Sequence, residues 1–319
     1  MRDLLNDYGR KRRPCLFVID FDMKEPFVCP LEDAAGQGVF FAIRGRGNRT
    51  PAGPLPAEVV WRRHPVPFDE YKRAFDLVQD ELRRGNTYLV NLTFPTPVDT
   101  NLDLSQLFDH SLAPFRLWYK DRLVAFSPEE FVAINGNTIR TCPMKGTIRA
   151  DADRAVEIIL ADEKEKAEHV TVVDLLRNDL SIVARGVRVE RWRYIDEVKT
   201  HEGRLLQVSS EITGRLEPDW HGRLGDIMAA LLPAGSVTGA PKKKTVEIIR
   251  RVESYNRGFY TGVFGVYDGR DLSSGVLIRL VERDGRGGLV YKSGGGVTMD
   301  SVPEAEYREL VEKVYAPFA

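Results

Sequence analysis

One lysine and two pairs of glutamates are the residues of this 319-residue chain whose types and spacing could do chemistry. Lys145 stands in "RTCPMKGTIRA", residues 140–150, between a methionine and a glycine. An ammonium group in such an apolar, glycine-flanked turn loses hydration, which lowers its pKa and makes a neutral amine available as a nucleophile or base. The same side chain could instead point outward into water, and the sequence alone leaves both interpretations open.

The glutamates occur with helical spacing. Glu165 and Glu168 lie three residues apart on one predicted helix, and Glu306 and Glu309 repeat this spacing on the last one. Residues three apart share a helix face, so two such faces brought together would offer four carboxylates to one cation. Mg²⁺ commonly binds one or two carboxylates directly and keeps several waters. From spacing alone, however, charged runs such as "DEKEKAEH" are more typical of solvated faces.

A candidate acid or base precedes the predicted hairpin that leads to Lys145. Glu129, in "SPEEF", could protonate a leaving hydroxyl if its environment raised its pKa. Glu130 is equally suited by sequence, and we expect one of the two to be a surface residue.

Two glycine-rich segments could receive an anion. "GSVTGAPKKKT" lacks the Gly-Lys-Ser/Thr of a phosphate loop, which excludes an NTPase of that type. Thr238 and Lys242 remain available there as an anion cradle where a helix begins. "KSGGGVT" contains Gly294, Gly295 and Gly296, whose consecutive amides a carboxylate could approach. Each segment could also be only a tight turn.

The elements that must position these residues follow from periodicity. Apolar residues recur three or four apart over 68–84 and stop at Gly85, which predicts an amphipathic helix. Asn135-Gly136 lies between two alternating runs and predicts a hairpin, so Lys145 should sit just beyond its second strand. Residues 151–184 predict two consecutive helices, and Pro303 begins the last helix.

The strands come as hairpins and do not alternate strictly with helices, which favours antiparallel sheets in a mixed α+β fold. We expect one domain over residues 1–319, with a short strand-rich segment at 1–67 and a catalytic core at 68–319.

Composition excludes several classes of partner. The formal charge is -1, so no global field favours nucleic acid or an anionic membrane. No apolar run is long enough to span a bilayer, and the run after "GRKRRP" is interrupted too soon for a signal peptide. Cys15, Cys29 and Cys142 form no paired pattern, which fits a reducing compartment. We therefore expect a cytoplasmic protein.

Taken together, eight segments resemble the chorismate-utilising enzymes of the anthranilate synthase component I type, and most closely the aminodeoxychorismate synthases component I. They occur in family order over roughly residues 68–315: "SPEEF", "PMKGT", "AEHVTVVDLLRNDL", "VSSEITGRL", "GSVTGAPKKKTVEII", "RGFYTGVFGVYD", "VLIR" and "SGGGVTMDSVPEAEYRE".

The resemblance implies two antiparallel sheets packed together with helices outside, and a site where chorismate meets Mg²⁺. It implies that the four glutamates bind the metal and that Glu129 is the general acid. The positions that match the family's substrate-binding residues are Thr147, Thr238, Lys242, Tyr260, Arg279, Gly294, Gly295 and Gly296.

Lys145 separates the members of the family. Anthranilate synthases are similar to "PIAGT" here, with a small residue that leaves room for ammonia at C2. In aminodeoxychorismate synthases the lysine can occupy C2 covalently and displace the C4 hydroxyl, after which ammonia enters at C4, and "PMKGT" matches this pattern. Isochorismate and salicylate synthases resemble a pattern with a lysine where Leu89 stands here, and leucine cannot activate water.

The resemblance therefore implies magnesium-dependent amination of chorismate at C4, giving 4-amino-4-deoxychorismate for 4-aminobenzoate and folate. No segment resembles a glutamine-hydrolysing domain, so ammonia would come from a separate glutamine amidotransferase subunit. The alternatives are an anthranilate synthase component I and a catalytically silent scaffold homologue. Gln207 replaces the histidine usual in the family, which removes any titrating role at that position, whereas His169 matches the family pattern.

Overall fold

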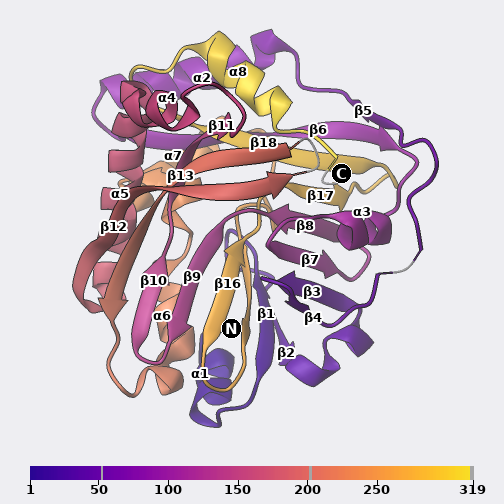
Figure 1. Cartoon of the computed structure of the whole chain (residues 1–319), viewed down its shortest axis with the longest axis vertical. Coiled ribbons are helices and arrows are strands. Elements are labelled where there is room, and N and C mark those ends of the chain that lie inside the picture. The colour runs from indigo at the N-terminus through magenta and orange to yellow at the C-terminus, as the bar shows by residue number, and fades with distance from the viewer. Residues whose placement is uncertain (52, 201–202, 317–319) are drawn as a thin grey trace.

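The strands of the chain form two antiparallel sheets (Figure 1). They are seen in a computed structural model that describes residues 1–51, 53–200 and 203–316, apart from the side chains of 147, 164, 198–200, 203 and 205. In order across it, the first sheet contains β11 (Met144–Arg149), β13 (Gly203–Arg215), β10 (Thr138–Thr141), β9 (Glu130–Asn135), β16 (Leu272–Val276), β15 (Val263–Tyr267), β1 (Cys15–Ile19) and β2 (Phe27–Pro30), with β12 (Arg185–Thr200) also paired to β13.

The second sheet shares no strand with the first. It contains β14 (Gly239–Ala240), β6 (Leu89–Thr100), β18 (Leu289–Val297), β17 (Leu280–Arg283), β8 (Leu123–Ser127), β7 (Phe115–Tyr119), β3 (Val39–Ile43) and β4 (Arg46–Gly47), with β5 (Trp61–Arg63) paired to β6. The helices of the described residues are α1 (Arg2–Arg10), α2 (Phe68–Arg83), α3 (Leu104–His110), α4 (Ala155–Ala161), α5 (Glu163–Val183), α6 (Leu224–Leu231), α7 (Lys242–Val252) and α8 (Pro303–Glu312).

Strand β1 shows how the layers pack, because it is buried on both faces. Successive side chains of a strand point to opposite faces. Leu16 and Val18 join a core that includes Phe41 and Leu117 of the second sheet, so this core lies between the sheets. Phe17 belongs instead to a core shared with α1, α5 and α6, which cover the outer face of the first sheet.

Helices α2, α7 and α8 cover the second sheet. Their apolar faces share a core with Val90, Leu92 and Phe94 of β6. The apolar residues spaced three or four apart over 68–84 therefore form the buried face of α2, as predicted. Helix α2 ends at Arg83, and Gly85 has φ +71°, a value at which a side chain would be strained. The mixed α+β fold with two antiparallel sheets and helices outside is therefore confirmed.

Local predictions are also confirmed at the hairpin and at the paired helices. Gly136 has φ +58° between β9 and β10, and residues 151–184 form α4 and α5. One local prediction is wrong. Lys145 lies in the edge strand β11 and not in a turn, because a partner strand distant in sequence supplies the hydrogen bonds. Gly294–Gly296 lie inside β18 and not in the tight turn that the sequence left open as an alternative.

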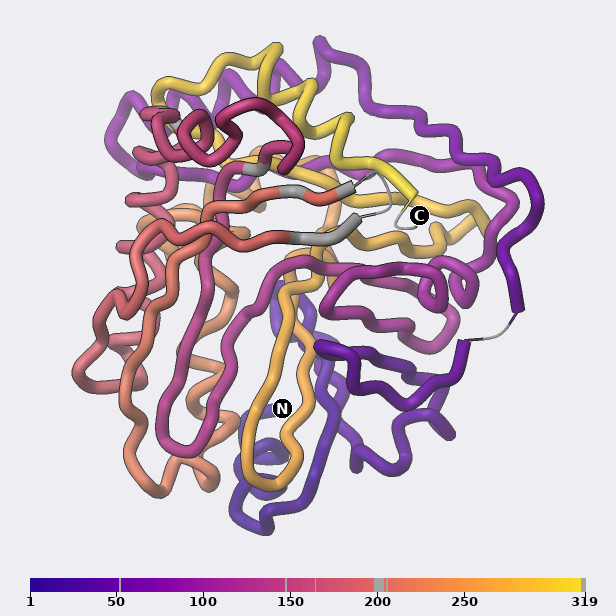
Figure 2. The backbone as a smooth tube through the Cα atoms, in the orientation of Figure 1, coloured from indigo at the N-terminus to yellow at the C-terminus, as the bar shows by residue number. Residues whose placement is uncertain are grey.

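The segment at residues 1–67 contributes strands to both sheets. The trace in Figure 2 follows this segment, in indigo, to β1, which pairs with β15, while β3 pairs with β7. The division of the chain at residue 67 stays a prediction. No helix within the described ranges combines the length and the apolar character needed to cross a membrane.

Candidate active site

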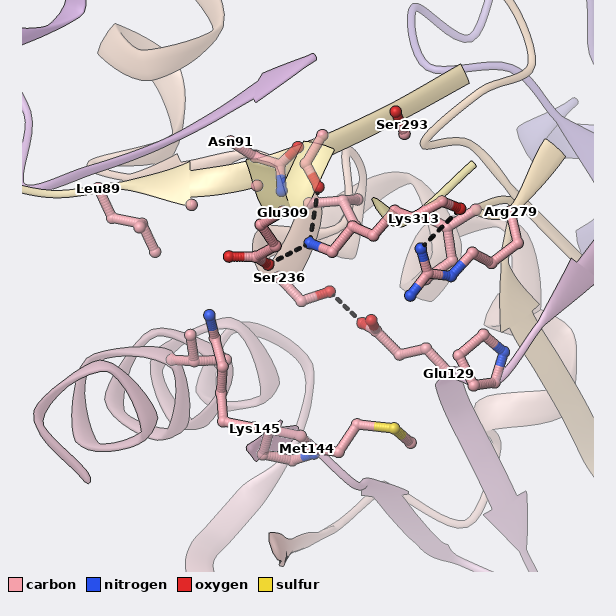
Figure 3. Close-up of a pocket in the computed structure, with 18 of the residues that line it drawn as sticks. Leu89, Asn91, Glu129, Met144, Lys145, Ser236, Arg279, Ser293, Glu309 and Lys313 are labelled. Atoms are coloured by element: carbon pink, nitrogen blue, oxygen red, sulfur yellow. Dashed lines mark hydrogen bonds and ion pairs between the residues drawn. The ribbon is translucent and has the colours of Figure 1, made fainter. Parts of the chain in front are cut away.

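A cavity of about 220 Å³ is lined by residues of both sheets, from β11 of the first and from β6 and β18 of the second (Figure 3). Its walls come from β6, β11, β18, the turn at 235–237 and α8, which are far apart in the sequence. The lining residues are Leu89, Asn91, Pro128, Glu129, Pro143, Met144, Lys145, Gly146, Val172, Gln207, Ser236, Val237, Tyr260, Ile278, Arg279, Lys292, Ser293, Gly294, Gly295, Gly296, Glu309 and Lys313.

Lys145 enters the cavity because β11 is irregular. The pairing of β11 with β13 shifts register between Lys145 and Thr147, and Gly146 between them has φ +77°. The Lys145 Nζ atom donates a hydrogen bond to Oε2 of Glu168 at 2.7 Å. Burial acts to lower the pKa of Lys145, but the nearby glutamates outweigh it and the pKa is raised. The sequence left open an amine with a lowered pKa and a side chain that points into water; the structure shows a side chain in the cavity with a raised pKa.

Glu129 faces Lys145 across the same cavity (Figure 3). It follows β8 and accepts a short hydrogen bond from the hydroxyl of Ser236. Burial raises its pKa above the usual carboxyl value, against the opposing effects of that hydrogen bond and of Lys145. A carboxyl group that keeps its proton is suited to protonate a leaving group.

Glu130 has a different environment from its neighbour. It is buried and forms ion pairs with Arg44 at 2.7 Å and Arg140 at 3.3 Å. The expectation that one of the two glutamates lies on the surface is wrong, because Glu129 faces the cavity and Glu130 is buried against two arginines that are themselves partly exposed.

The four metal-site candidates are on α5 and α8. Glu309 lines the cavity, whereas Glu165, Glu168 and Glu306 lie beside residues that line it. A methyl group built on Gly295 would lie 3.6 Å from Oε2 of Glu306 and 3.8 Å from Oε1 of Glu309, and one built on Gly146 would lie 3.6 Å from Oε2 of Glu165. Glu306 also accepts a hydrogen bond from Ser301 at 2.9 Å.

Their chemistry fits Mg²⁺, which prefers hard oxygen ligands. In the part of the chain that the structure describes, however, no three Asp, Glu, His or Cys side chains are gathered so that they could hold a metal ion. The donor set is present, and two lysines lie among the carboxylates.

The triple glycine opens one wall of the cavity. A Cβ on Gly294 would lie 2.6 Å from the Leu92 carbonyl oxygen, so a side chain there would collide with β6. Thr93 and Asn91, which face Gly294 and Gly296 across the ladder, donate their N–H groups to Glu253 and Thr238. The amides of Gly294 and Gly296 therefore point away from β6, where an anion could accept them.

Arg279 and Tyr260 line another part of the wall. Tyr260 is buried, and Nη1 of Arg279 donates to the Lys313 carbonyl oxygen at 3.3 Å. Arg279 has φ +51° at the point where the chain passes from β16 to β17, which are in different sheets. These residues give the cavity a cation and a hydroxyl group for a carboxylate.

Two predicted substrate-binding residues, Thr238 and Lys242, are not among the lining residues. Thr238 is buried and donates to the Ala234 carbonyl oxygen at 2.7 Å. Lys242 pairs with Asp179 at 2.9 Å and donates to the Leu231 carbonyl oxygen. Both stand behind the turn whose Ser236 and Val237 reach the cavity. The side chain of Thr147 lies outside the described residues.

Gln207 and His169 occupy different environments. Gln207 lines the cavity, whereas His169 is buried and its Nε2 lies 2.7 Å from the Ser210 hydroxyl oxygen. Burial, followed by the charges of Arg193 and Lys145, lowers the pKa of His169 to about 4. His169 is therefore neutral near pH 7 and is suited to a structural role.

Sequence reasoning missed several cavity residues. Lys313 pairs with Glu309 at 2.5 Å and donates to the Gly294 carbonyl oxygen at 2.8 Å. Its spacing of four residues from Glu309 on a predicted helix was a usable signal. Ser236, Asn91 and Lys292 carried no such signal, since their elements meet only in the folded chain.

Arg257 connects two of the cavity walls, β6 and the 235–237 turn. It donates to the carbonyl oxygens of Asn91 at 2.6 Å and Val237 at 2.9 Å, and pairs with Glu253 at 2.6 Å. Its side chain is 2% exposed, so this buried network holds the β6 strand and the 235–237 turn at one separation.

The cavity combines cations, open backbone amides and a carboxyl group with a raised pKa, a combination suited to a small carboxylate. Residues 36–319 match the family of chorismate binding enzymes, and the chain belongs to that family. It is thus an enzyme of a class that acts on chorismate.

Relatives carry different names. An uncharacterised PabA-like protein of Haemophilus influenzae is 50% identical over 312 residues, 98% of this chain and 94% of the relative. Anthranilate synthase component 1 of Archaeoglobus fulgidus is 34% identical over 77% of this chain and 61% of its own. Aminodeoxychorismate synthase component 1 of Bacillus subtilis is 30% identical over 79% of this chain and 55% of its own.

The fold is also shared with solved structures. MenF, the menaquinone-specific isochorismate synthase of Escherichia coli, superposes with a TM-score of 0.74 at 16% identity, covering 97% of this chain and 79% of MenF. At this level of identity the likeness shows the fold.

Proposed function

We propose that this chain is an aminodeoxychorismate synthase component I, which replaces the C4 hydroxyl of chorismate with an amino group from ammonia. The product would be 4-amino-4-deoxychorismate, a precursor of 4-aminobenzoate and folate. The observation that carries the proposal is that the Lys145 side chain extends into the cavity, which also contains Glu129. An amine and a protonatable carboxyl group are the two groups that this reaction needs.

Leu89 supports amination over hydration. It lines the cavity at the position where the isochorismate-type pattern has a lysine, and a methyl group on Gly296 would lie 3.0 Å from its Cδ1. This apolar side chain cannot accept a proton from water, so the cavity has no base at that position.

The proposed chemistry is a double displacement. The Lys145 amine, after losing its extra proton, attacks C2 of chorismate as the ring double bond shifts and the C4–O bond breaks. Glu129 gives its proton to the departing hydroxyl, which leaves as water. Ammonia then attacks C4, the double bond shifts back, and the C2–N bond breaks to return Lys145. The sum is exchange of hydroxyl for amine with release of one water.

The chain's own groups would orient the substrate. One carboxylate would accept from the amides of Gly294 and Gly296, and another would meet Arg279 and the Tyr260 hydroxyl. Mg²⁺, held by Glu165, Glu168, Glu306 and Glu309, would supply positive charge to a substrate carboxylate when bound.

Ammonia would come from a glutamine amidotransferase subunit. The name of the PabA-like relative agrees with this without identifying the partner. We place the enzyme in the cytoplasm.

The test is the identity of the product. Purified protein is incubated with chorismate, Mg²⁺ and ammonium, with and without an amidotransferase subunit and glutamine, and the products are separated by mass. We expect 4-amino-4-deoxychorismate with no pyruvate. Anthranilate with pyruvate would instead establish the second candidate, anthranilate synthase component I, which the 34% identity to such an enzyme favours. Complete inactivity with a competent partner would favour a silent homologue.

Replacing Glu309 with glutamine should weaken the response to magnesium. The amide keeps the shape of the side chain but removes a negative charge beside Gly295. We expect the Mg²⁺ concentration for half-maximal amination to rise roughly tenfold, which corresponds to a loss of about 1.4 kcal/mol.

The matched control is Glu304→Gln on the exposed first turn of the same helix, which should leave the titration unchanged. A Glu309→Gln enzyme that titrates like the wild type would remove Glu309 from the metal site.

A further inference from the structure

The carboxylates proposed to bind Mg²⁺ lie beside two lysines. Lys145, on β11, pairs with Glu168 of α5 at 2.7 Å, and Lys313, at the end of α8, pairs with Glu309 of the same helix at 2.5 Å. Both lysines line the cavity together with Glu309 (Figure 3). A positive charge is therefore present at each of the two glutamate pairs.

The lysines lie close to more than one acidic group each. A methyl group built on Gly295 would lie 3.8 Å from Nζ of Lys313 and 3.6 Å from Oε2 of Glu306, so this ammonium stands between the glycine strand and both α8 glutamates. Glu165 and Glu309 also act electrostatically on Lys145. The two ammonium groups therefore lie within electrostatic reach of carboxylates on both α5 and α8.

The charge of the four carboxylates explains why two lysines lie beside them. Four carboxylates gathered without cations would repel one another strongly in a partly buried site. Two ammonium groups carry the same total charge as one divalent cation. An exchange of the two for a metal ion would therefore leave the net charge of the site unchanged.

We propose that Lys145 and Lys313 are internal counterions, and that a divalent metal ion displaces them from Glu168 and Glu309. This rests on the proposed function only in taking these glutamates as metal ligands. Lys145 then has two positions: it pairs with Glu168 when no metal is bound, and its amine is released toward the middle of the cavity when the metal binds. Lys313 is assigned a role in metal binding without being a ligand.

The consequence is that removal of either lysine should tighten metal binding. We expect Lys313→Met and Lys145→Met each to lower the dissociation constant for Mg²⁺ alone, measured by titration calorimetry without substrate, by roughly tenfold or more. Lys313→Arg keeps the charge and should bind Mg²⁺ within about threefold of the wild type.

Lys166→Met is the matched control. Lys166 lies on α5 close to Glu165 and Glu168 in sequence but pairs with the exposed Glu163 at 3.1 Å. The Lys166→Met substitution changes the net charge by the same amount as Lys313→Met and Lys145→Met do. Its effect on Mg²⁺ affinity should be under about twofold because exposed charges are screened. Thermal unfolding of each variant shows that it is folded.

A second measurement follows Lys145 directly. An amine-directed label is applied to the wild type at one pH with and without Mg²⁺, and the peptide carrying Lys145 is quantified by mass spectrometry. We expect Mg²⁺ to increase labelling of Lys145 at least threefold and to leave Lys166 unchanged.

Metal affinity that is unchanged or weaker in both methionine variants, or labelling of Lys145 that Mg²⁺ does not increase, would overturn the proposal. Neither measurement needs turnover. A different product would therefore contradict the proposed function without affecting the counterion proposal. Unchanged Mg²⁺ affinity in the methionine variants would contradict the counterion proposal without affecting the proposed function.

Discussion

Replacement of Lys145 with alanine is expected to reduce C4 amination by roughly a thousandfold or more, as for the loss of a nucleophile in other enzymes. The Lys145 side chain extends into the cavity from β11, beside Gly146. The measurement is the rate of 4-amino-4-deoxychorismate formation with saturating ammonium.

The Lys145→Arg variant distinguishes the role of Lys145 as a nucleophile from its role as a positive charge. Arginine can keep the ion pair with Glu168 but stays protonated, so it cannot form a bond to C2. We expect it to be as inactive as the alanine variant, while Lys166→Ala on α5 retains full activity. Substantial turnover by either Lys145 variant would exclude a covalent lysine route.

Replacement of Glu129 with glutamine should have the second largest effect and should change activity and stability in opposite directions. The amide cannot protonate the leaving hydroxyl, so we expect the turnover number to fall by about 10²–10⁴-fold. Full activity in this variant would exclude Glu129 as the acid.

The stability effect follows from the raised pKa of Glu129. In the unfolded chain the carboxyl group titrates near 4.5, so between that value and the raised folded value the native state binds more protons. The free energy of unfolding therefore falls as pH rises through this window. Above the folded-state pKa, the native protein carries the full cost of the buried charge. Glutamine does not titrate, so we expect the Glu129→Gln protein to melt roughly 1–3 °C higher than the wild type at pH 7–8.

The difference in melting temperature should shrink as pH falls toward 4.5, because wild-type Glu129 is then protonated in the native state and the cost of the buried charge is removed. Glu130→Gln is the adjacent control with the opposite sign. It leaves Arg44 and Arg140 without the charge of a buried carboxylate, and should lower the melting temperature. Thermal scans from pH 5 to 8 distinguish the two residues, and a Glu129→Gln protein less stable than wild type at pH 8 would contradict the assignment.

The sequence by itself determined the local elements. Apolar spacing in residues 68–84 predicted α2, and Asn135-Gly136 predicted the β9–β10 hairpin, because helical period and turn chemistry are properties of neighbouring residues. The same information placed each glutamate pair on one helix face.

Long-range pairing decided the rest. The strand that carries Lys145 was predicted as a turn, because its hydrogen-bond partner β13 comes more than fifty residues later. The apolar neighbours of Lys145 in sequence made a lowered pKa one of two open interpretations, whereas the opposing charge of Glu168 comes from α5. Only the tertiary structure brings an amine and a carboxylate from separate elements to 2.7 Å. The hydrogen bond and charge of Glu168, together with the charges of Glu165 and Glu309, outweigh the cost of burial.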